Sequence, residues 1–245
     1  MLPLVKRYRK DYTTESIVVE RNYINGVWHD TTENVPNAVT NIQISNKAIV
    51  LGNGLGRLDL NLSVIKNHHG GLLGAKTLQS YGCNALYRDF APDFLIATGN
   101  EIIKELAESD YIKDHIVYTD AEHTLQYPNK FYMIPYNSYM DAGTTAAYIA
   151  AFDGHKRVYM LGFDHQPVLG FNNNVYAGTP CYDPVRSDIL DTSWIKARKM
   201  LFDVYDDVEF ILVSRTGRMT VSDTWAGCLN FRQASLKTFS LEVDL

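Results

Sequence analysis

The sequence has few cysteines, and no two of them are close together. Cys83, Cys181 and Cys228 lie far apart among the 245 residues. An odd number without a C-x-x-C pair excludes a disulfide framework and a zinc ribbon, and it predicts a reducing compartment. The chain also lacks the run of about 18 apolar residues that a membrane span needs, and its first residues lack the apolar stretch of a signal peptide. We therefore expect a soluble, cytoplasmic protein.

Positive charge is also scarce. There are 23 Lys and Arg against 28 Asp and Glu, which gives a net charge of −5. Binding to nucleic acid or to an anionic membrane needs a basic face, so neither is an expected partner. The one basic cluster, residues 6–10, is interpreted as a solvated terminus. A hydrophobic content of 46% with 12% aromatic residues excludes intrinsic disorder and suits one large domain.

Residues 1–45 are predicted to form a β-hairpin arm and a linker. Asn25-Gly26 stands between apolar, β-branched stretches at 16–20 and 22–29, and this dipeptide is typical of a type I′ hairpin turn. Residues 31–41 are polar, contain Pro36 and are expected to be linker. Because a lone hairpin is marginally stable in water, it must pack on the main domain or on another chain. The chain is therefore a candidate for a homo-oligomer or a larger assembly formed through the hairpin.

Residues 46–245 alternate short apolar runs with helical stretches. This pattern predicts a Rossmann-like α/β domain with a mostly parallel open sheet and helices on both faces, here a nucleotide- or nucleotide-sugar-binding domain. Strands are expected at 48–51, 78–83, 94–98, 115–118, 131–134, 158–161 and 208–213. Helices are expected at 58–67, at 100–108 with Asn100 as the cap, at 144–152, and up to 204 from a cap at Asp191 or Thr192.

Ligands of open parallel sheets bind beyond the carboxyl ends of the strands, so the loops there are the candidate site. Gly52-Asn53-Gly54-Leu55-Gly56-Arg57 follows the first strand of the sheet. Glycines allow close approach of a ligand, and amides at a helix start favour phosphate. Arg57 stands where a dinucleotide fingerprint requires glycine, and no Walker sequence is present. The alternative is a tight turn without a ligand.

Three further loops carry candidate binding residues. Asn84, after the second strand, offers both a donor and an acceptor to a base or ribose, and Asn100 follows the third strand. Gly143, Thr144 and Thr145 open an alanine-rich helix, where hydroxyls and amides form an anion site or small residues merely permit close packing. The sequence Gly162-Phe163-Asp164-His165 sets a carboxylate beside an imidazole, which suits ribose binding, metal orientation or a general base.

Metal ligation is not predicted, because the sequence has no H-x-x-x-H or H-E-x-x-H pair. Asp93, Asp141 and Asp164 are the carboxylates that would hold Mg²⁺ with substrate phosphates if they converged. A serine hydrolase is disfavoured because G-x-S-x-G is absent. Mg²⁺ is thus the only cofactor considered, and only for phosphotransfer.

Taken together, the segments 48–54, 83–84 and 143–164 resemble those of bacterial CMP-sialic-acid-dependent sialyltransferases. They are also similar to the wider group of motility accessory factor glycosyltransferases and hydroxymethylpterin pyrophosphokinase-like proteins. The resemblance covers residues 47–213 in order and spacing. It implies nucleotide binding by Gly52, Asn53, Gly54 and Asn84. It also implies donor phosphate or sugar contacts by Gly143, Thr144, Thr145, Gly162, Phe163 and Asp164.

The sequence departs from that family in two places. Leu55-Gly56 stands where the family has Pro-Ser after Gly-Asn-Gly, and the stretch 180–193 has no histidine where the family has its catalytic base. His165 or Asp183 would then have to act as the base, with Tyr182 and Asp188 as further substitutes.

Three functions follow from these residues. The leading one is a glycosyltransferase that uses a nucleotide sugar resembling CMP-sialic acid and inverts the anomeric centre on an acceptor hydroxyl of a glycan or protein. The second is Mg²⁺-dependent pyrophosphokinase-type transfer, which a chelator would abolish. The third is a catalytically silent assembly protein that keeps the fold, which the missing histidine motivates.

Overall fold

The structure is a computed structural model that describes residues 4–9, 15–36, 45–68, 78–135, 140–164, 173–185 and 193–245. His165, the expected caps Asp191 and Thr192, and the expected linker beyond residue 36 lie outside these ranges. None of the described helices is both long and apolar enough to cross a bilayer.

The main body is built on a parallel sheet, as the alternating pattern predicts. Eight strands lie in the order β11-β10-β9-β4-β5-β6-β7-β8, and every neighbouring pair is parallel. They are β4 (Lys47–Leu51), β5 (Gln79–Cys83), β6 (Phe94–Ile96), β7 (Ile116–Thr119), β8 (Tyr132–Met133), β9 (Arg157–Leu161), β10 (Glu209–Ser214) and β11 (Phe231–Ser235). This order defines a Rossmann-like α/β fold and confirms the expected fold class.

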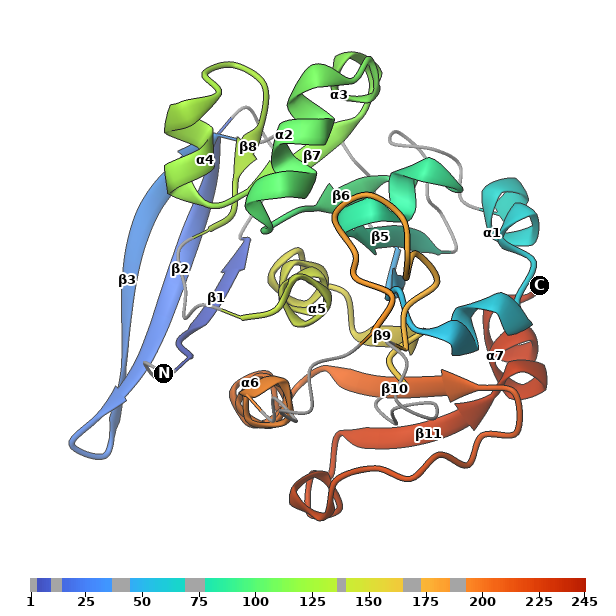
Figure 1. Ribbon diagram of the computed structural model, residues 1–245. Coiled ribbons are helices and arrows are strands. Elements are labelled where there is room, and N and C mark those ends of the chain that lie inside the picture. The colour runs from blue at the N-terminus through green and yellow to red at the C-terminus, as the bar shows by residue number, and fades with distance from the viewer. Residues whose placement is uncertain are drawn as a thin grey trace.

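Helices cover both faces of this sheet (Figure 1). Alternate residues of β4 point to opposite sides, so Ala48 and Val50 join one buried cluster while Ile49 and Leu51 join the other. The first cluster lies under α5 (Ala142–Phe152) and α6 (Ser193–Val204), and the second under α1 (Leu62–His68), α2 (Asn100–Glu108) and α7 (Leu236–Val243). Short helices complete the body: α3 (Tyr111–Asp114), α4 (Ala121–Gln126), η1 (Leu55–Asp59), η2 (Asn84–Arg88) and η3 (Asp223–Trp225).

Two expected helices differ from the structure in detail. The stretch predicted as one helix at 58–67 divides into η1 and α1. The cap of α2 is Gly99, and Asn100 is the first helical residue. The Asn100 side chain instead accepts a hydrogen bond from His123 Nε2 at 2.9 Å if that nitrogen carries the proton.

The N-terminal segment forms a second, antiparallel sheet of three strands, β1 (Lys6–Arg9), β2 (Glu15–Ile24) and β3 (Val27–Pro36). The β2–β3 hairpin is confirmed, and its turn residues Asn25 and Gly26 have φ of 51° and 83°, as a type I′ turn requires. Residues 31–36, expected to be linker, instead complete β3, because each pairs with a residue of β2. The boundary between arm and main domain at residues 45 and 46 stays a prediction.

The basic cluster at the start of the chain is not simply solvated. Lys6 Nζ lies 2.8 Å from a carboxylate oxygen of Asp207, and Arg9 Nε lies 2.9 Å from Asp153 Oδ1. The side chains of Arg9 and Asp153 are only 6% and 2% exposed. Charge pairing with residues distant in sequence therefore fixes β1 beside α5, where Figure 1 places it.

Candidate functional site

The strand order places the first candidate loops together. β5, β6, β7 and β8 lie on one side of β4, and β9, β10 and β11 lie on the other. The order of the strands thus reverses between β4 and β9, and ligands of such sheets bind beyond the carboxyl ends of the strands at this point. Residues 52–57 follow β4 and residues 162–164 follow β9, so both expected loops lie at the switch point.

The glycines of these loops serve contact between the loops. Gly52 N donates to Leu161 O at 2.8 Å, and Gly54 N donates to Gly162 O at 2.9 Å. A Cβ atom on Gly52 would lie 2.4 Å from Gly162 O, and one on Gly54 would lie 2.7 Å from the same oxygen. Close packing of two backbones therefore explains why these positions are glycine, and the Gly52 and Gly54 amides point into the protein.

Asp164 holds the glycine loop in place. Its Oδ2 accepts a hydrogen bond of 2.7 Å from Gly56 N and one of 3.2 Å from Asn173 Nδ2. Asn173 Oδ1 in turn accepts from Leu55 N at 3.0 Å. The amides of Leu55 and Gly56 are thus bound to side chains, and those of Gly52 and Gly54 to backbone oxygens, so these four amides are not left for a phosphate.

Arg57 holds several elements of the site together, although the sequence marks it only as a departure from the dinucleotide-binding fingerprint. It is 2% exposed, although most buried arginines carry a cost unless they are paired. Its guanidinium donates to Asn53 Oδ1 at 3.2 Å, to Asp89 Oδ2 at 3.1 Å and to the Tyr176 hydroxyl at 3.0 Å. Asn53 thus faces Arg57, and its own Nδ2 donates to Cys83 O at 3.3 Å. Arg57 therefore links the loop after β4 to η2 and to the segment 173–185.

A cavity of about 360 Å³ opens beyond the ends of β5 and β6, beside the switch point. It brings together the two expected nucleotide residues Asn84 and Asn100, with Tyr182 and Cys181 on its far wall. Asn84 has a φ of 47°, and its Oδ1 accepts from Thr98 N at 3.3 Å. These contacts fix the direction of the Asn84 amide. Burial raises the pKa of Tyr182, so its phenol stays neutral and hydrogen-bonding.

The start of α5 is the second polar centre. Asp141 caps the helix, accepting from Thr144 N at 3.0 Å and from the Thr144 hydroxyl. Thr145 N and the Thr145 hydroxyl donate to backbone oxygens of Asp141 and Met140. Among the described residues, the amides of Ala142 and Gly143 have no acceptor. The expected donors of Thr144 and Thr145 are thus engaged, and the first turn keeps two amides for a ligand.

Arg198 joins this centre, and no motif pointed to it. It lies on α6, its Nε donates to the Thr144 hydroxyl at 3.2 Å, and its Nη2 lies 3.9 Å from Asp141 Oδ1. Its guanidinium carbon lies 4.7 Å from the ring centre of Phe163 and 4.6 Å from that of Trp194. Burial lowers the pKa of Arg198, which reflects a cation largely removed from water. The place of Arg198 depends on packing of α6 against α5, which sequence spacing does not reveal.

Cys83 ends β5 between these groups. Burial, with a smaller effect of Asp141, raises the pKa of its thiol to about 12. A neutral thiol is a poor nucleophile and a poor metal ligand. Cys83 is therefore a buried, neutral thiol at the end of β5.

The candidate base residues differ in whether the structure describes them. Asp183 is exposed in the segment 173–185 and directly follows Tyr182, which lines the cavity. His165 follows Asp164 directly but lies outside the described residues. Asp188 also lies outside them, so Tyr182, which lines the cavity, and its neighbour Asp183 are the expected bases whose places can be described.

The three carboxylates considered for Mg²⁺ do not meet. Asp93 precedes β6, at the amino end of the sheet, and accepts from Ser80 N at 2.9 Å. Asp141 and Asp164 lie at the carboxyl end, where they cap α5 and hold the glycine loop. In the part of the chain that the structure describes, no group of three or more His, Cys, Asp or Glu side chains is arranged to hold a metal ion.

Neither a protein-family model nor a curated protein sequence matches this chain. Among solved structures, the sialyltransferase CstII from Campylobacter jejuni with the substrate analogue CMP-3FNeuAc is similar at 13% identity and a TM-score of 0.41, over 68% of this chain and 79% of that one. A substituted form of sialyltransferase CST-II with CMP is similar at 14% identity and a TM-score of 0.41, over 68% and 81% of the two chains.

Proposed function

We propose that the chain is a glycosyltransferase that uses a nucleotide-sugar donor resembling CMP-sialic acid. The observation that carries the proposal is the cavity beside the switch point, which holds Asn84 and Asn100 together. The motif resemblance implied a nucleotide at Asn84, and open α/β sheets bind ligands at this place.

The nucleoside would occupy the Asn84 cavity. Asn84 Oδ1 is engaged with Thr98 N, so Nδ2 is the atom left to donate to a base or ribose oxygen. The Tyr182 ring lies 5.9 Å from that of Tyr176, which supports it from behind as an apolar wall. A planar base fits against such a wall.

The donor phosphate would lie at the start of α5. The amides of Ala142 and Gly143 and the positive end of the helix dipole favour an anion there. Asp141 opposes an anion at this place, and Arg198 at 3.9 Å offsets that negative charge. Phe163 and Asp164 shape the floor, because Phe163 packs on Arg198 and Asp164 holds the glycine loop.

The reaction is an in-line displacement. An acceptor hydroxyl oxygen bonds to the anomeric carbon and loses its proton to a base, for which Asp183 and His165 are the candidates. The bond from the anomeric carbon to the phosphate oxygen breaks, and its electron pair leaves with the nucleotide. Arg198 and the α5 amides stabilise the negative charge on the departing phosphate.

Thermal unfolding with CMP, CDP, UDP, GDP, ATP, GTP, NAD and CMP-sialic acid, each with and without Mg²⁺, tests the proposal. A ligand at about a hundredfold its Kd stabilises by roughly 2.7 kcal/mol, which is several degrees for a chain of this size. We expect a shift with cytidine nucleotides that does not need Mg²⁺. A shift with ATP that needs Mg²⁺ would replace the proposal with phosphotransfer, and no shift with any nucleotide would overturn both.

Asn84→Ala should abolish the shift, and Asn129→Ala is its matched control. Both asparagines have positive φ, 47° and 63°, so alanine strains both backbones alike, while Asn129 is exposed and outside the cavity. Equal loss of the cytidine shift in the two variants would show that strain, and not the Asn84 amide, explains the loss. For the base, Asp183→Asn and His165→Ala are compared for sugar transfer with nucleotide binding retained.

A further inference from the structure

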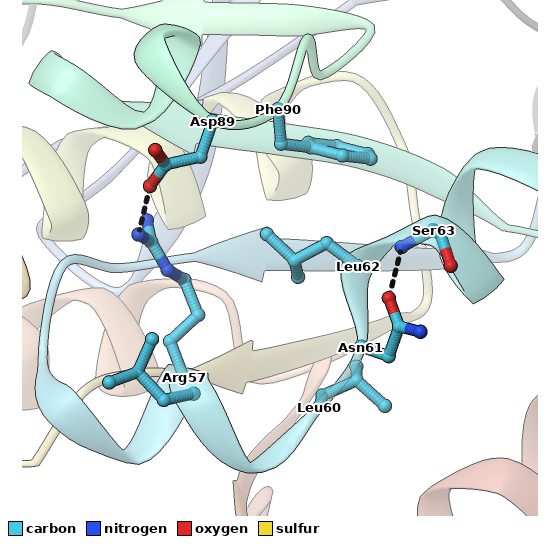
Figure 2. A pocket seen from close by; sticks show the side chains of 8 residues that line it. Arg57, Leu60, Asn61, Leu62, Ser63, Asp89 and Phe90 are labelled. Atoms are coloured by element: carbon cyan, nitrogen blue, oxygen red, sulfur yellow. Dashed lines mark hydrogen bonds and ion pairs between the residues drawn. The ribbon is translucent and has the colours of Figure 1, made fainter.

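A second cavity, of about 460 Å³, lies on the other side of the Arg57 network. Figure 2 shows it between Asp89 and Phe90 on one side and Arg57 and Leu60 on the other. Arg57 separates it from the loop after β4, because one end of the guanidinium binds Asn53 and the other binds Asp89. The cavity is lined by η1, by the segment into α1 and by the segment after η2, and it includes none of the residues assigned to the nucleotide.

The charged groups of this cavity are fixed in direction. Asp89 Oδ2 accepts from Arg57 Nη2 at 3.1 Å and from the Tyr176 hydroxyl at 2.7 Å. The Asp89 side chain is nevertheless 49% exposed, and its second oxygen has no acceptor role within the described residues. A carboxylate held by two buried partners is a rigid acceptor for hydroxyl groups.

The remaining lining is apolar with an uncharged polar rim. Leu58, Leu60, Leu62 and Phe90 form the apolar part, and Leu58 is 66% exposed. Asn61 and Ser63 supply an amide and a hydroxyl, both exposed. A ligand on this surface meets hydrocarbon on one side and acceptors and donors on the other.

These features select one class of ligand. Arg57 and Asp89 form an ion pair without net charge, and its exposed member is the Asp89 carboxylate, which disfavours an anion. A purely apolar ligand would desolvate the exposed carboxylate without giving it a hydrogen bond, which costs free energy. A neutral ring that bears several hydroxyls and keeps an apolar C–H face satisfies both sides, and the volume is within the usual range for small-ligand sites.

We propose that this cavity binds a neutral sugar unit of an acceptor glycan. The acceptor role rests on the proposed function, and because the buried Arg57 network stands between this cavity and the switch point, the sugar bound here is not the unit whose hydroxyl reacts. Asp89 accepts hydroxyl hydrogens of the sugar, and Leu58 and Phe90 contact its C–H face. The binding site itself does not require that transfer occurs.

The test uses the full-length labelled chain on an array of neutral and acidic oligosaccharides, followed by calorimetry with the best-retained glycan. Leu58→Asp places a charge against the apolar side, and Leu125→Asp is the matched control because Leu125 is also exposed, at 83%, but lies on α4. We expect retention of neutral glycans and a loss of affinity of about tenfold or more in Leu58→Asp. Leu125→Asp should bind as the wild type does. Asp89→Asn, which keeps the size of the side chain, should also weaken binding.

The outcomes separate the two proposals. If no glycan is retained while CMP still raises the thermal midpoint of the wild type, the sugar site is wrong and the proposed function stands. If glycans bind but no nucleotide does, the cavity stands and the transferase is wrong. Preference for charged glycans, or equal affinity of the two leucine variants, would also overturn the sugar site.

Discussion

Replacing Asp164 tests whether this residue builds the site or performs its chemistry. The sequence offers Asp164 as a ribose ligand, a metal ligand or a base. In the structure its Oδ2 is bound to Gly56 N at 2.7 Å and Asn173 Nδ2 at 3.2 Å. Asp164→Ala removes both bonds and leaves the backbone hydrogen bonds of Gly52 N and Gly54 N to join the two loops.

The size of the effect follows from the kind of bond. A hydrogen bond to a charged group contributes about 1.5–3 kcal/mol, and a buried donor left without an acceptor costs a similar amount. Gly56 is half-buried, so we expect Asp164→Ala to lower the free energy of unfolding by about 2–3 kcal/mol. In a chain of this length that corresponds to a fall of roughly 4–12 °C in the thermal midpoint.

Urea unfolding and differential scanning calorimetry measure this loss. Asp164→Asn keeps a side-chain oxygen for Gly56 N and should lose only about 1 kcal/mol. Asp59→Ala, at an exposed carboxylate of η1, should be unchanged within about 0.5 kcal/mol. The reasoning is refuted if Asp164→Ala is no less stable than Asp59→Ala.

Three further predictions concern backbone, charge and thiol. Gly162→Ala should cost about 2–4 kcal/mol in urea, because Gly162 has a φ of +76° and a Cβ there would lie 2.8 Å from Gly52 O, whereas Gly227→Ala, with no atom within 4 Å, should be neutral. Burial alone would raise the pKa of Asp207, but hydrogen bonds from Lys6 and Lys156 outweigh it and hold that pKa at about 2. Because this pKa is lower in the folded state, the stabilisation is complete above about pH 4 and is lost towards pH 2. Asp207→Asn should therefore make the free energy of unfolding depend less on pH in that range, and an unchanged pH dependence would contradict this reasoning. With a pKa of about 12, Cys83 should not react with a thiol reagent at pH 8 until the chain unfolds, and fast labelling in the native state would contradict its burial.

The sheet was predictable because its strands are marked locally. Continuous apolar runs such as 48–51 are typical of strands buried on both faces, and each of the seven expected runs is a strand of the parallel sheet. β11 was not predicted, because Phe-Arg-Gln-Ala-Ser lacks such a run and lies half-exposed at the edge of the sheet. The polar residues 31–36 resemble a linker for the same reason, since only their pairing with β2 makes them a strand.

The sequence predicts where the candidate loops lie better than it predicts what their residues bind. Loops after parallel strands converge by topology, so the sequence could place Gly52, Gly162 and Asn84 at the carboxyl edge of the sheet. What these groups bind depends on tertiary contacts, and local spacing does not encode them. Gly54 and Asp164 serve the contact between two loops, and the roles of Arg57 and Arg198 depend on partners in other elements.

The docking of β1 has a consequence for how the chain acquires its structure. Lys6 and its partner Asp206 are 200 positions apart in the sequence. At a synthesis rate of about 5–20 residues per second, the β2–β3 hairpin is synthesised roughly 9–34 seconds before that partner exists. Closing such a long loop is among the slowest steps of folding, so attachment of the N-terminal strand is expected to be a late event. Docking of β1 does not cover the hairpin tip, because Ile24, Val27 and Trp28 stay exposed in the folded chain.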